Sequence, residues 1–137
     1  MSDFHFEFDH IGIAVNSLDE GGEFYKALGL TETHREVVAS EKVATSFFPL
    51  KNTSDLELLQ ATDPESPIQK FLDKKGPGIH HICLRVKNLD ALVAQLKSKN
   101  VKLINEEPRK GAHNCRVVFV HPKSTGGVLI ELSEPGV

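Results

Sequence analysis

The chain has 137 residues, of which 39% are hydrophobic and 26% are charged, enough for one globular domain that buries its own core. Its net charge of −3 comes from acidic and basic residues mixed along the chain, which excludes the basic surface of a nucleic-acid-binding protein. The first eight residues lack the features of a signal peptide, and no stretch approaches the roughly 18 apolar residues of a membrane-spanning helix. We therefore expect a soluble, cytoplasmic protein with no nucleic-acid or membrane partner.

The first half of the chain predicts a strand, a helix and three more strands. Residues 8–15 alternate as in a half-buried strand, which places His10 on the face opposite the large apolar side chains. Residues 18–28 read as an amphipathic helix, with Ser17 as its N-cap and Gly29 at its C-terminal cap. Shorter strands are expected at residues 36–39, 42–49 and 56–60.

A linker and a second set of the same elements follow. Residues 63–78 begin and end with turn-forming residues, and residues 68–75 within them read as a short helix. A strand is expected at residues 79–86 and a helix at residues 89–99. The remaining strands of this half are expected at residues 101–104, 116–120 and 128–132.

The two halves are copies of one unit. Residues 9–19 match residues 80–90 at an offset of 71 positions (81 − 10 = 71), and residues 58–60 match residues 129–131 at the same offset (131 − 60 = 71). We expect a single domain, 1–137, with one module at about residues 6–62 and another at about residues 79–135. Because equivalent positions in a repeat often have equivalent roles, the repeat singles out four candidate metal ligands: His10, Gln60, His81 and Glu131.

These four residues suit a divalent metal ion. Two imidazoles with two oxygen donors fit a borderline ion such as Co²⁺, Ni²⁺, Mn²⁺, Fe²⁺ or Zn²⁺. If the two sheets curl into a shared cup with the helices outside, the strand alternation brings all four side chains to one interior place. Taken alone, a residue of each of these types is more often structural or solvent-exposed than a metal ligand. Two pairs of such residues at one offset are poorly explained by exposure to solvent. Two coordination positions would stay open for a chelating substrate.

The chain resembles the vicinal oxygen chelate superfamily, and within it the methylmalonyl-CoA epimerase family. The first strand is shared across the superfamily, whereas the linker and the two loops that contain residues 107–113 and 121–127 are more specific to the epimerases. Together the matching segments cover nearly the whole chain. They are residues 9–15, 24–25, 56–59, 63–68, 78–82, 107–113 and 121–132.

The resemblance implies an α+β fold in which two βαβββ modules form a cup-shaped mixed sheet. It implies that His10, Gln60, His81 and Glu131 bind a divalent metal, with Co²⁺ expected first and Mn²⁺, Ni²⁺ or Zn²⁺ as alternatives. The implied activity is the epimerisation of (2R)- and (2S)-methylmalonyl-CoA, by removal of the C2 proton through a metal-stabilised enediolate. In that reaction the resemblance gives Glu131 a proton-transfer role as well. The partner is then a small acyl-CoA substrate, and the protein is expected to form a homodimer.

The sequence departs from part of this family at the second proton-transfer group. Several bacterial epimerases carry a glutamate where this chain has Thr45, and a threonine is a poor base at neutral pH. Glu57, Glu41 or a metal-bound water are the alternatives, and none is assigned.

The basic residues of the second half have two interpretations each. Arg109, Lys110 and Lys123 could contact the phosphates of coenzyme A or could be solvated charges. Arg85 could pair with a substrate carboxylate or with a carboxylate of the protein. Cys83 and Cys115 are far apart and form no C-x-x-C motif, so both are expected to be ordinary small side chains.

Two other functions stay open. A glyoxalase-I-like lactoylglutathione lyase would use similar enediolate chemistry on a hemithioacetal, and it would need the metal as well. A small-molecule binding module of the same fold would need no metal. A dioxygenase is disfavoured, because Gln60 as a fourth ligand would occupy a position needed for oxygen and substrate.

Overall fold

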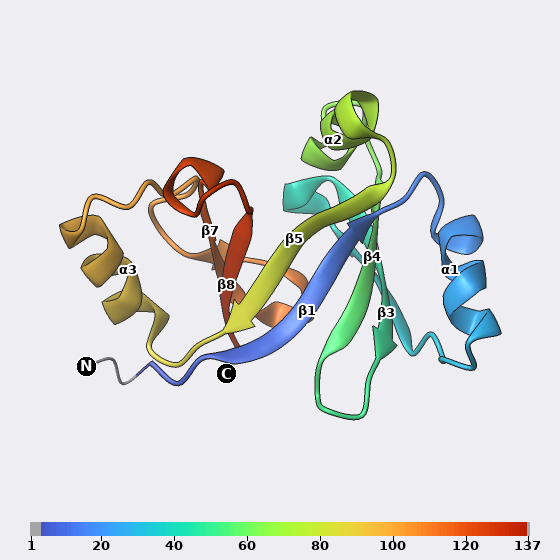
Figure 1. Ribbon diagram of the computed structural model, residues 1–137, viewed down its shortest axis with the longest axis horizontal. Helices are drawn as coiled ribbons and strands as arrows, with labels where there is room; N and C mark the ends of the chain where they lie inside the picture. The colour runs from blue at the N-terminus through green and yellow to red at the C-terminus, as the bar shows by residue number, and fades with distance from the viewer. Residues whose placement is uncertain (1–3, 137) are drawn as a thin grey trace. The chain divides into compact units, whose positions relative to one another are not determined.

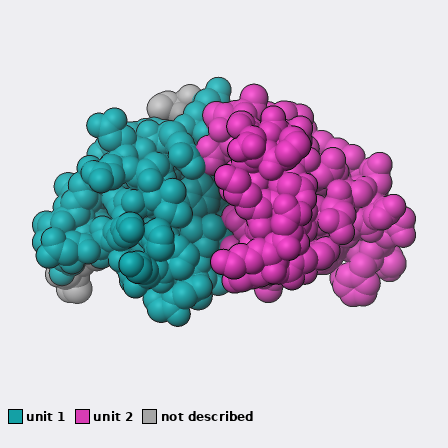
Figure 2. All heavy atoms as spheres, turned by 90° about the horizontal axis from the view of Figure 1, so that it is seen from above, with its two compact units in different colours: residues 1–9, 81–137 teal, residues 10–80 magenta. Residues whose placement is uncertain are grey.

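The computed structural model describes residues 4–136, which divide into two compact units. Residues 10–80 form unit 2, and residues 4–9 together with residues 81–136 form unit 1 (Figure 2). Two strands, β1 (Glu7–Ala14) and β5 (Gly78–Arg85), contribute residues to both units. Each unit therefore contains a stretch of chain that continues directly into the other.

Unit 2 contains most of β1 and a mixed sheet (Figure 1). The elements after β1 are α1 (Leu18–Ala27), β2 (His34–Val38), the 3-10 turn η1 (Ala39–Glu41), β3 (Val43–Pro49), β4 (Asp55–Ala61) and α2 (Pro67–Lys75). Strand β4 lies parallel to β1 and antiparallel to β3, which in turn pairs antiparallel with β2.

Helix α1 packs on one face of this sheet and determines which side chains lie on the other. Its N-cap is Ser17, whose side chain accepts a hydrogen bond from Glu20 N. Leu18 of the helix packs with Phe48 of β3 and Leu58 of β4 in a buried cluster. Because side chains alternate along a strand, the neighbours of these residues in β3 and β4 point to the opposite face.

Unit 1 repeats the pairing pattern of unit 2. Its elements after β5 are α3 (Leu89–Ser98), β6 (Arg109–Lys110), the 3-10 turn η2 (Ala112–Asn114), β7 (Arg116–Val120), the 3-10 turn η3 (Pro122–Ser124) and β8 (Ile130–Glu134). Strand β8 lies parallel to β5 and antiparallel to β7, which pairs antiparallel with the short strand β6. The repeat is thus present in the structure as two βαβββ modules, and the predicted α+β fold class is confirmed.

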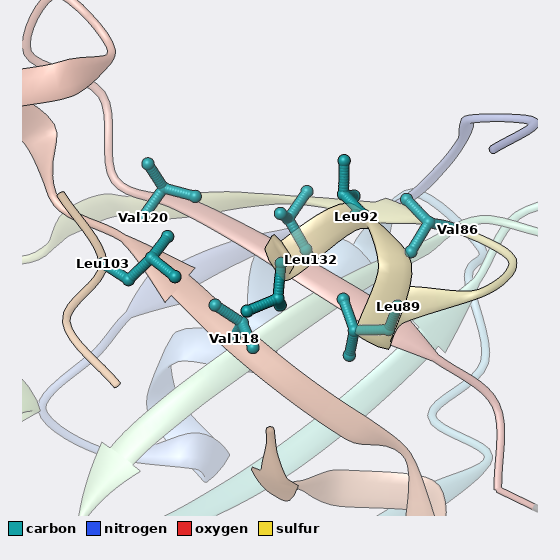
Figure 3. Packing of buried hydrophobic residues seen from close by; sticks show 8 residues of the cluster. Val86, Leu89, Leu92, Leu103, Val118, Val120 and Leu132 are labelled. Atoms are coloured by element: carbon teal, nitrogen blue, oxygen red, sulfur yellow. The ribbon is translucent and has the colours of Figure 1, made fainter. Parts of the chain in front are cut away.

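The core of unit 1 lies between α3 and one face of its sheet. Leu89 and Leu92 of the helix pack against Val118 and Leu132 of the strands, and all four are nearly inaccessible to solvent (Figure 3). Burying a side chain of this size contributes about 1.5–3 kcal/mol. The opposite face of the sheet is left for polar side chains.

The prediction of a strand at residues 101–104 is wrong. Only Leu103 makes a bridge there, to Val120. The side chain of Asn105 then makes hydrogen bonds to the backbone of β7 that a paired strand would make with its own backbone. Its Nδ2 donates to Val117 O, and its Oδ1 accepts from Phe119 N. The chain consequently turns away from β7 after one bridge, and regular pairing resumes only at β6.

The segment predicted as a linker, residues 63–78, contains α2 and belongs to unit 2. Ser66 is the N-cap of α2, its side chain accepting from Ile68 N, and Gly76 ends the helix with a positive φ. Among residues 4–136, no helix has the length and apolar composition needed to cross a membrane.

Candidate functional site

Unit 1 contains a buried histidine–carboxylate pair. His81 lies on β5 and Glu131 on the neighbouring β8, with His81 Nε2 3.0 Å from Glu131 Oε1 and side chains only 5% and 11% exposed. Phe119 pairs with Glu131 across β7 and β8, and its ring meets the His81 ring edge-on at a centroid distance of 5.8 Å. These three side chains lie on the sheet face away from α3, which we call the histidine face of unit 1.

Unit 2 contains a pair of the same kind. His10 lies on β1 and Glu57 on the neighbouring β4, with His10 Nε2 3.2 Å from Glu57 Oε2 and side chains 8% and 7% exposed. Phe47 of β3 pairs with Glu57, as Phe119 pairs with Glu131 in unit 1. These side chains lie on the sheet face away from α1, the histidine face of unit 2.

The strand registers identify Glu57 as the counterpart of Glu131. Glu57 pairs with Gly12, two residues after His10, and Glu131 pairs with Cys83, two residues after His81. The spacing from histidine to carboxylate is 47 residues in unit 2 (57 − 10) and 50 residues in unit 1 (131 − 81). Three additional residues in unit 1 therefore break the constant offset of 71.

Gln60 lies elsewhere, so its predicted equivalence with Glu131 is wrong. It shares a face of β4 with Leu58, and its side-chain Oε1 accepts a hydrogen bond of 2.8 Å from Leu18 N at the start of α1. Its counterpart is Glu134, whose Oε2 accepts from Leu89 N at the start of α3. Both side chains accept a hydrogen bond from a backbone N–H at a helix N-terminus, where the helix itself provides no acceptor.

A signal for Glu57 was present in the sequence. Glu57 stands between Leu56 and Leu58, and both leucines belong to the packing against α1. In a strand, the residue between two core-facing residues points to the other face. Strand alternation would thus have identified Glu57, whereas a constant offset identified Gln60.

Thr45 lies on β3 with 1% of its surface exposed. Its hydroxyl donates to Glu36 O of the neighbouring β2, at 3.2 Å. The side chain is therefore engaged in a bond to the backbone, as expected for a structural threonine. Of the alternatives considered for a second base, Glu57 lies beside His10 and Glu41 lies in the turn η1.

The basic residues of unit 1 differ in their surroundings. Arg85 lies near two carboxylates of the protein, with Nε 3.7 Å from Glu7 Oε1 and Nη1 3.5 Å from Asp9 Oδ1, which agrees with the second interpretation of this residue. Arg109 lies on β6, with its Cζ 5.9 Å from the centre of the Phe119 ring. Lys110 and Lys123 are exposed, the first on β6 and the second in η3.

The ionic contacts on the helix side of unit 1 are structural. Arg116 lies 2.8 Å from Asp90 of α3 and 3.0 Å from Glu134 of β8. Hydrogen bonds from Arg116 hold the pKa of Asp90 below its ordinary value, against a smaller opposing effect of desolvation. The arginine thus links α3 to the sheet on the face opposite the histidine.

The two cysteines lie in buried or partly buried surroundings. Neither forms a disulfide, and Cys83 is completely buried. Burial raises the pKa of the Cys115 thiol, which lowers the fraction of reactive thiolate at neutral pH. The expectation that both are ordinary side chains agrees with these surroundings.

Several known proteins are similar to this chain over most of its length. Mitochondrial methylmalonyl-CoA epimerase from Homo sapiens is 41% identical over 128 residues, which cover 92% of this chain and 72% of that protein. The crystal structure of methylmalonyl-CoA epimerase from Mycobacterium tuberculosis has a TM-score of 0.90 at 41% identity, covering 95% of this chain and 88% of that one. A structure of methylmalonyl-CoA epimerase in complex with methylmalonyl-CoA and NH4+ has a TM-score of 0.87 at 37% identity, with 93% of each chain covered.

These relatives are isomerases, and the predicted resemblance to their family is confirmed. The model of the Glyoxalase/Bleomycin resistance protein/Dioxygenase superfamily matches residues 9–119, a range that begins in β1 and ends in β7 and so covers most of both modules. The chain belongs to this superfamily.

Proposed function

We propose that this protein is a metal-dependent epimerase that interconverts (2R)- and (2S)-methylmalonyl-CoA. The observation that carries the proposal is the repeated buried pair, His10 with Glu57 and His81 with Glu131. Similarity to methylmalonyl-CoA epimerases over more than nine tenths of the chain supports the choice of substrate.

The residues present fit a divalent metal ion. Two ligand atoms that bind one ion at about 2.1 Å and at a right angle lie about 3.0 Å apart. The nitrogen-to-oxygen distances of the two pairs, 3.2 and 3.0 Å, agree with this value. Two carboxylates also balance the charge of a dication, and the mixed nitrogen and oxygen donors suit Co²⁺, Mn²⁺, Ni²⁺ or Zn²⁺. Co²⁺ is the ion we expect first.

We propose His10, Glu57, His81 and Glu131 as the metal ligands, with Glu57 in the place predicted for Gln60. The contact between His10 and Glu57, and the hydrogen bond from Leu18 N to Gln60, support this exchange. A Gln60 side chain that caps α1 would have to leave the helix before it could bind an ion beside His10.

The proposed chemistry begins with removal of the C2 proton of the substrate. Glu131 accepts the proton on one face of C2, and a second group returns one to the opposite face, which inverts the carbon. The enediolate formed in between carries negative charge on the thioester oxygen, for which a bound divalent cation supplies a Lewis acid. Phe119 covers one side of His81 and limits the access of water to the pair.

Solvent deuterium incorporation at C2 of methylmalonyl-CoA, followed by NMR, tests this function. The protein is first treated with a chelator and then measured with and without added Co²⁺ or Mn²⁺. We expect exchange that depends on the metal. Absence of exchange from protein with bound metal would exclude the epimerase and favour glyoxalase-like chemistry, whereas a failure to bind any metal would favour a binding module.

The homodimer and the cytoplasmic location stay predictions. The human relative is named as mitochondrial, which differs from the location predicted for this chain. Sedimentation of the purified protein tests the first prediction, and microscopy of the tagged full-length protein in its own cells tests the second.

A further inference from the structure

Strand β2 carries a third histidine–carboxylate pair. His34 and Glu36 are two residues apart on this strand, so their side chains lie on the same face. His34 Nε2 lies 3.3 Å from Glu36 Oε1, and the two side chains are 49% and 28% exposed. Solvent and dissolved ions therefore reach this pair, unlike the two buried pairs.

The pair lies at the edge of the histidine face of unit 2. His34 pairs with Phe47 of β3, and Phe47 pairs with Glu57 of β4, while β2 is the last strand of its sheet. Because neighbouring strands are about 4.8 Å apart, the backbones of His34 and Glu57 are separated by roughly 10 Å, with Phe47 between them. Each of the two pairs in unit 2 would consequently hold its own ion.

The geometry of the pair suits a metal ion. Two ligand atoms that bind one ion at about 2.1 Å and at a right angle lie about 3.0 Å apart, and the distance between His34 and Glu36 is close to this value. The His34 ring stacks on the Phe47 ring, with a centroid distance of 5.7 Å and an interplanar angle of 20°. A metal ion binds a ring nitrogen in the plane of the imidazole, so stacking orients the ring without covering the ligand atom.

The surroundings of the pair also favour a cation. Arg35 stands between the two residues in sequence but points to the opposite face, where it lies 2.6 Å from Asp19 and 2.7 Å from Glu32. Its charge is therefore directed away from the pair. The Thr45 hydroxyl donates to Glu36 O at 3.2 Å, which fixes the backbone that carries the carboxylate and reduces the freedom lost when an ion binds.

In unit 1 the position equivalent to Glu36 carries a positive charge. Arg109 occupies it, because both residues pair with the residue that lies two positions before the phenylalanine of their histidine face. A guanidinium has no lone pair to offer a metal ion. The repeat thus predicts one ion of this kind per chain.

We propose that His34 and Glu36 bind a divalent transition-metal ion at the edge of the histidine face of unit 2, in addition to the ion of the proposed active site. The inference goes beyond the proposed function and does not require it. An imidazole with a carboxylate suits Cu²⁺, Ni²⁺ and Zn²⁺, whereas Mg²⁺ and Ca²⁺ prefer oxygen ligands alone. Because water completes the coordination at an exposed pair, this ion should bind more weakly than the ion of the proposed active site.

Titration calorimetry of the full chain with Zn²⁺, after removal of metal by a chelator, tests the inference. We expect a tight and a weak phase in the wild type. His34→Gln should weaken the second phase by at least about tenfold, and Glu36→Gln, which keeps an oxygen ligand but loses its charge, by less. The controls are His5→Gln and Glu23→Gln, which change exposed residues elsewhere and should keep both phases.

Proton NMR of the histidine rings gives a second readout. The His34 signal, identified by its absence from His34→Gln, should move in the wild type during the weak phase. Equal thermal midpoints of the metal-free variants ensure that ion binding, and not folding, is compared.

The outcomes separate this inference from the proposed function. A weak phase that is missing from the wild type, that persists unchanged in His34→Gln, or that is lost equally in His5→Gln overturns the inference and means that Zn²⁺ binds this surface only adventitiously. A weak phase that requires His34, in a protein that shows no tight phase, supports the inference and contradicts the metal dependence of the proposed function.

Discussion

Glu57 and Gln60 lie on opposite faces of β4, so the proposed metal binding and the capping of α1 belong to different residues. The first lies beside His10 on the histidine face, and the second accepts from Leu18 N on the helix face. We predict that Glu57→Gln weakens Co²⁺ binding by at least about tenfold, because it removes a charged oxygen ligand. Gln60→Ala should leave Co²⁺ affinity unchanged and lower the free energy of unfolding by about 1 kcal/mol, as loss of a helix cap typically does.

Titration calorimetry with Co²⁺ and urea unfolding in the presence of a chelator measure the two effects separately. Glu134→Gln is a useful comparison, because Glu134 caps α3 as Gln60 caps α1 and should likewise leave metal binding intact. Strong loss of Co²⁺ affinity in Gln60→Ala, with little change in Glu57→Gln, would restore the ligand set inferred from the repeat.

Three of the four proposed ligands could be predicted from the sequence, because His10, His81 and Glu131 lie within matching segments. Glu57 was missed for a physical reason. The constant offset fails where unit 1 contains three more residues than unit 2 between histidine and carboxylate, as the strand registers show. The offset therefore indicated Gln60, although the alternation of Leu56, Glu57 and Leu58 favoured Glu57. The position of Arg109 over Phe119 could not be predicted from the sequence either, because β6 has only two residues and therefore shows no strand periodicity.

At the scale of elements, Gly21 of α1 lies so close to Val15, the residue after β1, that there is no room for a side chain. A Cβ added to Gly21 would lie 2.6 Å from Val15 Cγ1, well inside van der Waals contact. Alanine is the better helix former by about 1 kcal/mol, but we expect the clash to dominate. Gly21→Ala should therefore lower the free energy of unfolding by roughly 1–3 kcal/mol, as measured by urea denaturation.

Glu23→Ala is the control for this variant, because Glu23 lies in the same helix and is exposed. It should change the stability by less than about 0.5 kcal/mol. A Gly21→Ala protein more stable than the wild type would mean that Val15 moves aside at little cost.

The sequence predicted α1 and α3 within a few residues, because each helix has an amphipathic pattern that extends over ten residues. It wrongly predicted a strand at residues 101–104, where the Asn105 side chain replaces backbone pairing.

At the scale of the whole molecule, chain connectivity predicts cooperative unfolding. Unit 1 is made of residues 4–9 and 81–136, with all of unit 2 inserted between them, and β1 and β5 run without a break from one unit into the other. Within unit 1, Phe4 O accepts from Lys87 N, so the N-terminal segment is part of its structure. Loss of order in either unit would therefore release part of a strand that the other needs.

Each unit contains a probe of its own. The single tyrosine, Tyr25, packs on the core of unit 2, and the buried thiol of Cys83 lies in unit 1. We predict that tyrosine fluorescence and alkylation of Cys83, resolved from Cys115 by peptide mass spectrometry, give the same urea midpoint, as a two-state transition requires. Exposure of Cys83 at a clearly lower urea concentration than the change at Tyr25 would mean that unit 1 unfolds first and that strand continuity does not couple the units. Saturating Co²⁺ should raise both midpoints together in the wild type, because a hundredfold excess over Kd adds about 2.7 kcal/mol to the free energy of unfolding. In Glu57→Gln, which binds the ion more weakly, the same Co²⁺ concentration should raise both midpoints less.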